Sequence, residues 1–283
     1  MTSAAPTRTI RVAHSPDSDD AFMFYALAEG RIDTGHLRYV HELQDIESLN
    51  QRALRGELEV TAVSIHAYAH LSDRYALLPH GASMGDRYGP RLVARTPMTR
   101  ADVRGKRIAV PGPLTTAFLA LKLYEPDFTP VQTRFDEIEE AVARGDVDLG
   151  LLIHEGQLTY AGQGLHLVAD MGNWWYDDTG LPLPLGGNVV RKDLGEETIK
   201  TISRHLRASI AYALEHRSDA LDHAMRFARG LDRASADEFV GMYVNDWTLD
   251  YGERGRRAVR ELLRRGAEAG VIPRRVEVEF VEG

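Results

Sequence analysis

The sequence predicts an α/β fold of two lobes, with mixed, mainly parallel sheets and a C-terminal helical part. Three observations support this prediction. Short apolar, β-branched runs alternate with amphipathic stretches through the first two thirds of the chain, which is typical of βαβ units. Helical periodicity fills most of the remainder. Two passages with turn-forming residues mark places where the chain could cross between lobes.

The predicted strands are short runs rich in Ile, Leu and Val that end at polar or turn-forming residues. They cover residues 10–14, 58–64, 92–95, 107–110, 131–135, 149–154, 165–170 and 188–192. The stretches between them place apolar residues at helical spacing, which predicts helices. These helices cover residues 45–56, 64–72, 115–123 and 136–144.

The last third of the chain has a different character. Between residues 194 and 270, apolar residues recur at helical spacing with charges on the opposite face, and strand signals are nearly absent. We expect three or four consecutive helices there. The final run VEVEFV, residues 276–281, predicts an edge strand.

Two crossings between lobes set the predicted domain boundaries. Thr96 and Pro97 precede the strand RIAV, and the Pro/Gly-rich passage GLPLPLGG covers residues 180–187. A hinge, and a ligand site in the cleft between lobes, follow from two such crossings. The predicted lobes are residues 1–96 together with 188–283, and an inserted lobe of residues 97–187.

Composition excludes several classes of function. With 43% hydrophobic residues among 283, the chain can fill large cores. The net charge is −8 and basic residues form no run, so a nucleic-acid partner is not expected. The absence of cysteine excludes disulfides, thiolate metal ligands and cysteine nucleophiles. No apolar stretch approaches the roughly 20 residues of a membrane span, and no signal-peptide core opens the sequence, so a cytoplasmic protein is expected.

Polar residues follow four predicted strands, at the ends where α/β sheets bind ligands. After the first strand, Ser15 and the following amides could hold a carboxylate, and Ser18 or Asp19 could cap the next helix. The two roles are compatible. A calcium loop starting at Asp17 is not expected, because Phe22 stands where such a loop needs glycine.

The second and third strand ends carry hydroxyl groups at the start of a helix. Ser64 could cap its helix or form an anion cradle with neighbouring amides. Thr115 and Thr116 could bind a carboxylate or a hydroxyl group, or cap the helix that follows. His66 and His70 lie four residues apart, but the glutamate of an H-E-x-x-H motif is missing, so no metal is expected there.

His154, at the end of the fourth strand, is the candidate for proton transfer. The strand before it is wholly apolar, and burial of an imidazole that has no function there is unfavourable. An ordinary histidine pKa of about 6.5 suits a general base. A histidine satisfied by a backbone carbonyl is the alternative. Glu155 could orient the ring, or face a helix start or solvent. Nucleophile-elbow, P-loop and GxGxxG motifs are absent, which disfavours a hydrolase triad and nucleotide cofactors.

Together these motifs resemble the 1,4-dihydroxy-6-naphthoate synthases, a family of the futalosine route to menaquinone that is related to chorismate dehydratase. The resemblance covers about residues 9–270. The matching passages include DIESLNQRAL, SIHAYAHLSDRYALLPHGASMG, AVPGPLTTAFLALKLY and YVNDWTLDYGERGRRAV. The most distinctive stretch runs from His154 to Gly186, where I-H-E, W-W and G-L-P-L-P-L-G occur in family order.

The resemblance implies a two-lobed fold of periplasmic-binding-protein type II. It also implies an enzyme that converts cyclic dehypoxanthine futalosine, a small carboxylated substrate, to 1,4-dihydroxy-6-naphthoate, with His154 as general base. The substrate contacts that it implies are Ala62, Val63, Ser64, Thr116 and Ala117, with Thr115 adjacent. Neither a metal nor a redox cofactor is implied, and a homodimer is possible. Trp174 and Trp175 could stack on the bicyclic ring or fill the lobe interface.

The sequence departs from the family pattern in places that bear on the substrate. The family's S-P-C-P-N-D-T-F reads S-P-D-S-D-D-A-F from Ser15 to Phe22, Ala62 stands where lysine is frequent, and Leu114 replaces histidine or a similar residue. A related carboxylate is therefore an alternative substrate. Chorismate dehydratase is an alternative enzyme. A non-catalytic solute-binding protein for a small anion is the alternative from another class, although a histidine in the cleft argues against it.

Overall fold

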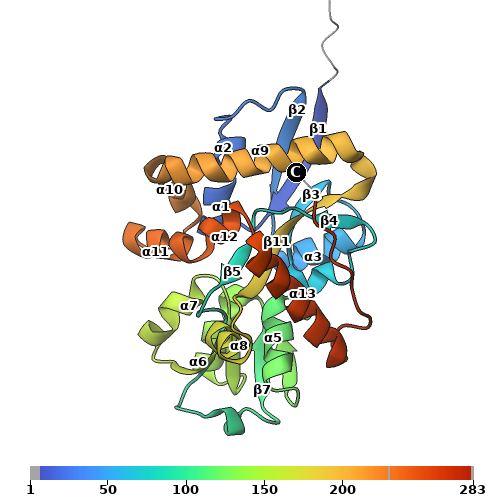
Figure 1. Cartoon of the computed structure of the whole chain (residues 1–283). Coiled ribbons are helices and arrows are strands. Elements are labelled where there is room, and N and C mark those ends of the chain that lie inside the picture. The colour runs from blue at the N-terminus through green and yellow to red at the C-terminus, as the bar shows by residue number, and fades with distance from the viewer. Residues whose placement is uncertain (1–6, 229, 282–283) are drawn as a thin grey trace, which may run out of the picture.

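The computed structural model describes residues 7–228 and 230–281. Its strands form two sheets that lie one above the other in Figure 1, with helices around each of them. This arrangement confirms the predicted α/β fold with mixed sheets. The first strands of the chain belong to the upper sheet in that view, and the middle of the chain forms the lower one.

The first sheet has the strand order β2-β1-β3-β11-β4, and β5 also pairs with β11. Its strands are β1 (Arg8–His14), β2 (Leu37–Leu43), β3 (Val60–Ser64), β4 (Tyr75–Leu77), β5 (Ser83–Gly85) and β11 (Leu183–Arg191). Strand β1 runs parallel to β2 and β3, with Val12 opposite Val60. Strand β11 runs antiparallel to β3, β4 and β5.

The second sheet has the strand order β10-β6-β9-β7-β8. Its strands are β6 (Arg91–Ala94), β7 (Arg107–Val110), β8 (Thr129–Gln132), β9 (Leu149–Leu152) and β10 (His166–Asp170). Strand β7 runs parallel to β8 and β9, whereas β6 runs antiparallel to β9 and β10. In both sheets the parallel pairs therefore lie beside antiparallel strands. Among the described residues four strand pairs are parallel and five are antiparallel, so the prediction that the sheets are mainly parallel is wrong, because β6 and β11 run against their neighbours.

Helices follow the strand ends, as the alternating pattern predicts. In the first two thirds of the chain they are α1 (Ser18–Met23), α2 (Tyr25–Ala28), α3 (Ile46–Leu54), α4 (Ile65–Tyr68), α5 (Thr116–Tyr124), α6 (Ile138–Arg144), α7 (Gly156–Thr159) and α8 (Met171–Thr179). Short 3-10 turns cover Arg100–Asp102, Phe135–Glu137, Tyr160–Gln163, Lys192–Leu194 and Met225–Phe227.

The C-terminal third is helical, as expected, although its described residues form five helices where three or four were predicted. Its helices are α9 (Glu196–Glu215), α10 (Arg217–Ala224), α11 (Arg233–Tyr243), α12 (Asp246–Leu249) and α13 (Gly252–Glu268). Helix α9 lies across the first sheet, and α13 packs against β11, α4 and α5 (Figure 1). Among the described residues, no helix has both the length and the apolar character that crossing a membrane requires. The predicted edge strand at 276–281 is reduced to one bridge, between Phe280 and Leu77 of β4.

The chain passes between the sheets twice. Strand β5 still pairs in the first sheet, whereas β6 already pairs in the second, so the first passage comes before the predicted boundary at residue 97. The return lies between α8 and β11. The division into two lobes stays a prediction, and by sheet membership we would place its boundaries near residues 86–90 and 180–182.

The two sheets share one apolar core. Val63 and Leu77 of the first sheet belong to the same buried cluster as Ile108 and Leu149 of the second. Burial of such a side chain contributes roughly 1.5–3 kcal/mol. Strands β3 and β9 are buried along their whole length, which explains why neither contains a charged residue. The core thus holds the carboxyl ends of both strands close to one cavity.

Candidate active site

A cavity lies between the two sheets, and every site residue predicted from the sequence lines it. Those residues are Ser15, Ala62, Val63, Ser64, Thr115, Thr116, Ala117 and His154. The first four belong to the first sheet and its turns, and the last four follow strands of the second sheet. The structure therefore brings the predicted residues together, while their individual roles stay predictions.

The turn from β1 into α1 forms the first wall. Asp17 is the N-cap of α1, and its Oδ1 accepts a hydrogen bond from the backbone N–H of Asp20 at 3.4 Å. The prediction that Ser18 or Asp19 caps this helix is wrong, because the helix begins at Ser18. The Ser15 N–H donates to Oδ2 of Asp20 at 2.7 Å. This turn is thus held together by its own acidic side chains.

The turn from β3 into α4 contributes Ser64, the last residue of β3. Asn50 of α3 holds it: Oδ1 of Asn50 accepts from the Ser64 N–H at 2.9 Å, and Nδ2 donates to the Ser64 Oγ at 3.2 Å. Because Oγ accepts in this pair, the hydroxyl hydrogen of Ser64 can still be donated to a ligand. The residue occupies the N-cap position of α4 as predicted, but its hydroxyl makes no cap bond there.

The turn from β7 into α5 forms the opposite wall. Thr115 caps α5, and its Oγ1 accepts from the N–H of Phe118 at 3.2 Å. The N–H groups of Thr116 and Ala117 lie in the first turn, where a helix offers them no acceptor of its own. Such groups, together with the helix dipole, favour an anion. The backbone of this turn can therefore bind a carboxylate.

The side chain of Thr116 connects the second sheet to the first. Its hydroxyl donates to the carbonyl oxygen of Leu185 on β11 at 2.6 Å and accepts from the N–H of His66 on α4 at 3.1 Å. The hydroxyl is thereby used within the protein. Any contact between Thr116 and a substrate would come from its backbone N–H.

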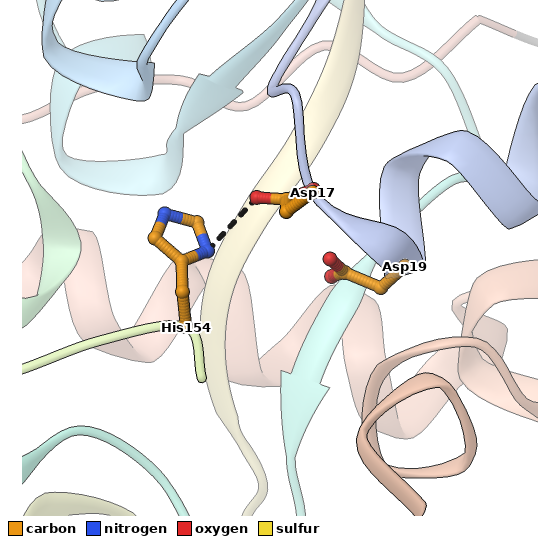
Figure 2. A group of neighbouring side chains, drawn as sticks. All are labelled: Asp17, Asp19 and His154. Carbon is orange, nitrogen blue, oxygen red and sulfur yellow. Dashed lines mark ion pairs between the residues drawn. The ribbon is translucent and has the colours of Figure 1, made fainter. Parts of the chain in front are cut away.

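His154 follows β9 and faces the first wall from the second sheet (Figure 2). Its Nδ1 lies 2.9 Å from Oδ2 of Asp17, so the alternative of a backbone carbonyl partner does not describe this nitrogen. The backbone of His154 has a φ of 53°, a left-handed conformation that costs a non-glycine residue about 1 kcal/mol. Phe135 packs edge-on against the ring, with the centroids 4.9 Å apart. The imidazole is thus held in one place at the cavity.

Acidic side chains gather around this imidazole. Burial and the neighbouring charge of Asp17 raise the pKa of Asp19 well above its ordinary value, and burial raises the pKa of Asp20 to about 8. Both groups therefore hold their protons more strongly than an ordinary aspartate does. Glu155, at the start of α7, is buried instead of facing solvent. The cavity therefore carries less negative charge than its number of acidic residues suggests, and it repels a carboxylated ligand less.

Asp17, Asp19 and His154 could also hold a cation. Each places one ligand atom within 4.8 Å of those of the other two, and carboxylate and imidazole ligands suit divalent metals. However, 2.9 Å between Nδ1 and Oδ2 is also the length of a direct hydrogen bond, and this is how we interpret the pair. The expected absence of a metal stays a prediction.

The tryptophan pair belongs to the protein interior. Trp175 is fully buried, and its Nε1 donates to the carbonyl oxygen of Pro182 at 3.1 Å. Trp174 packs edge-on against Tyr124, with the centroids 5.5 Å apart. Neither tryptophan is among the described residues that line the cavity. This geometry fits the alternative in which the two tryptophans fill the predicted lobe interface, and it does not fit stacking on a ring bound in the cavity.

Sequence reasoning missed several residues that line the cavity. They include Asp17, Asp19, Asp20, Gln157, Asn188, Phe239 and Tyr243. The acids were considered only as caps or calcium ligands, although a run of acids directly after a strand was a signal for the site. Tyr243 reaches the cavity from α11, where its hydroxyl donates to Oε1 of Gln157 at 2.7 Å. No pattern in the sequence marks that long-range approach.

Comparisons with known proteins agree on one family, which belongs to menaquinone biosynthesis. Residues 10–268 match a protein family described as menaquinone biosynthesis. A 1,4-dihydroxy-6-naphthoate synthase of Thermus thermophilus is 43% identical over 262 residues, which are 93% of this chain and 95% of that protein. The enzyme of the same name from Streptomyces coelicolor is 40% identical over 271 residues, 94% of this chain and 95% of that protein.

Solved structures show the same fold. A crystal structure of a protein from Archaeoglobus fulgidus has a TM-score of 0.89 and 50% identity, and the match covers 93% of this chain and 98% of that one. The alkanesulfonate-binding protein of Xanthomonas axonopodis, bound to MOPS, has a TM-score of 0.68 at 15% identity, over 97% and 98% of the two chains. The second likeness shows the fold alone, which is that of periplasmic binding proteins.

Proposed function

The chain belongs to the menaquinone biosynthesis family, and from this premise we propose that it is a 1,4-dihydroxy-6-naphthoate synthase acting on cyclic dehypoxanthine futalosine. The observation that carries the proposal is the position of His154. Its ring lies at the end of a buried strand and lines the same cavity as the helix starts at Ser64 and Thr116. That is the arrangement in which a base could meet an anchored anion.

Recognition of the substrate carboxylate falls to hydrogen-bond donors. The described residues that line the cavity include neither lysine nor arginine, so the anion must be held by N–H and O–H groups. The free amides of Thr116 and Ala117 and the hydroxyl of Ser64 are such donors on opposite walls. The raised pKa values of Asp19 and Asp20 lower the negative charge that would repel the carboxylate.

The proposed chemistry is an elimination. His154 removes a proton from a carbon of the substrate, and the electron pair of that C–H bond forms the new C=C bond as the bond to the sugar-derived fragment breaks. Formation of the aromatic naphthalene ring supplies the driving force. No electrons are exchanged with a cofactor in this sequence. Closure of the two lobes would keep water away from the intermediate.

The test is turnover by the purified chain. Incubation with cyclic dehypoxanthine futalosine should release 1,4-dihydroxy-6-naphthoate, whereas chorismate should remain unchanged. Conversion of chorismate instead would make the chain a chorismate dehydratase. Tight binding of either anion without any product would make it a solute-binding protein, which its fold also allows.

Two further expectations accompany this proposal. The cytoplasm is the proposed location, because the relatives are named as biosynthetic enzymes and their small substrate would be made there. A homodimer is the proposed assembly, and light scattering of the purified chain would check it. The binding partner that we propose is the small carboxylated substrate.

A further inference from the structure

We infer that Asp17 is a positioning residue for His154, and that it holds the Nδ1 edge of the imidazole so that the Nε2 edge can meet the substrate. The inference rests on the proposed function, since it states how the general base is prepared. Oδ2 of Asp17 lies 2.9 Å from Nδ1 of His154. Figure 2 shows the second ring nitrogen on the side away from Asp17.

The surroundings make this pair a strong one. The side chain of Asp17 is 3% exposed and that of His154 is 16% exposed. With little water nearby, a hydrogen bond between an imidazole and a carboxylate is stronger than on the surface. A carboxylate only accepts hydrogen bonds, so it selects the ring form that carries a proton on Nδ1. The lone pair then resides on Nε2.

Asp17 is itself oriented, because its two oxygens have different partners. Oδ1 accepts from the N–H of Asp20 as the cap of α1, while Oδ2 meets the imidazole. The cap fixes the carboxylate at the start of a helix, so the group cannot turn away without loss of that bond. An orienting group needs this kind of support to keep a base aligned.

The other acids near the ring are less suited to this role. Asp19 and Asp20 carry raised pKa values and so hold their protons more strongly than an ordinary aspartate, and Glu155 follows His154 directly in the chain, at the start of α7. Phe135 offers only its ring edge. Of the groups that face the imidazole, Asp17 is the carboxyl in direct contact with Nδ1.

The proton balance of the step is simple. The substrate C–H bond breaks, its proton forms an N–H bond at Nε2, and the electron pair stays with the substrate for the elimination. The ring then carries a positive charge, with protons on both nitrogens. The negative charge of Asp17, 2.9 Å away, stabilises this imidazolium.

The test is Asp17→Asn, compared with the wild type as the full chain. Asparagine caps helices as well as aspartate does, so α1 should be retained. Its Nδ2 group would face Nδ1 as a donor and favour the opposite ring form, with the lone pair on the wrong nitrogen. We expect kcat to fall on the order of 100-fold with KM changed less than about threefold. The acid limb of the kcat/KM profile should move down by roughly one to three pH units.

A matched control separates this effect from the loss of a charged cap. Asp232 caps α11 and accepts from the N–H of Ser235 at 2.8 Å, and its side chain lies outside the described cavity lining. Asp232→Asn changes the same atoms in a cap, and its kcat and pH profile should match those of the wild type. Unfolding temperatures of both variants should stay within a few degrees of the wild-type value.

A second measurement does not depend on turnover. Long-range ¹H–¹⁵N NMR reports which ring nitrogen of His154 carries the proton, and a His154→Asn spectrum identifies the signal. The proton should reside on Nδ1 in the wild type and shift away from Nδ1 in Asp17→Asn. If the wild type fails to convert the substrate, the proposed function fails, while this spectrum still decides the role of Asp17.

Three results would overturn the inference. The first is an unchanged kcat and acid limb in Asp17→Asn, and the second is an unchanged ring spectrum. The third is loss of activity on treatment with a chelator and its recovery with Mn²⁺ or Zn²⁺, since Asp17 would then be a metal ligand.

Discussion

The turn after β1 and the turn after β7 both lead from a buried strand into a helix, yet they bring different chemistry to the cavity. The first carries acidic side chains, one of which meets the imidazole of His154. The second carries threonines whose hydroxyls are used within the protein, which leaves backbone N–H groups for a ligand. One turn therefore prepares the base, and the other offers a place for the anion.

Removal of the His154 imidazole should have the largest effect on turnover. The change His154→Asn keeps a residue that tolerates a left-handed backbone but removes the imidazole. Turnover should fall by a factor on the order of 10² to 10⁴, while circular dichroism and unfolding temperature stay close to those of the wild type. Steady-state kinetics with cyclic dehypoxanthine futalosine measure the effect. Wild-type turnover in a folded variant would assign the base to another group.

Thr116 allows the backbone and side-chain contributions of the second turn to be measured separately. Thr116→Val removes the hydroxyl bonds to Leu185 and His66 and should lower the free energy of unfolding by about 1–3 kcal/mol. Thr116→Pro removes the backbone N–H as well, at a helix position where proline fits.

The pair of variants then isolates the amide. KM of Thr116→Pro should exceed that of Thr116→Val by roughly tenfold or more, since a hydrogen bond to a charged group contributes about 1.5–3 kcal/mol. Equal KM values in the two variants would remove this N–H from the proposed anion site. Urea denaturation of both proteins checks that the fold is intact.

The last expected effect is on stability alone and concerns the protonated state of the acidic turn. Burial raises the pKa of Asp20 to about 8, so the native state binds a proton that the unfolded chain releases above about pH 4. This contribution to stability is lost as the pH rises towards 8. Asp20→Asn should therefore become more stable, relative to the wild type, between pH 5 and pH 8.

The control for Asp20→Asn is the same substitution at an exposed aspartate. Asp177 on α8 is exposed, and Asp177→Asn removes a carboxyl group without disturbing the acidic turn. Thermal unfolding at pH 5, 6, 7 and 8 measures both series. A difference between Asp20→Asn and the wild type that does not change with pH would mean that this carboxyl is ionised in the native state.

The sequence was sufficient for much of the fold and for the helix cap at Thr115. Strands β3 and β9 are buried throughout and carry no charge, so both are visible in the sequence without structural context, and a threonine before an amphipathic run is a local signal. The position of the passage between the sheets is hard to predict from the sequence, because β6 is a short apolar strand that would suit either sheet. Its membership depends on pairing with β9 and β10, which are distant in the chain.

The contacts that define the candidate site were harder to predict for the same reason. The hydroxyl of Thr116 is bound by Leu185, which lies 69 residues away, and Asp17 meets His154 across the two sheets. Helix capping by an acid is a local property of the chain, whereas pairing with an imidazole requires the tertiary fold. The resemblance pointed to His154, but residue 17 is where this chain departs from the family pattern.

The origin of Asp17 and His154 in different sheets bears on how the protein would choose among similar anions. A molecule too large or too poorly shaped to let the lobes meet would be held by amides while the base lacked its carboxylate. Such a molecule would occupy the site without reacting. Discrimination would then arise from the ability to close the cleft more than from strength of binding, and analogues that wedge the lobes apart would act as inhibitors.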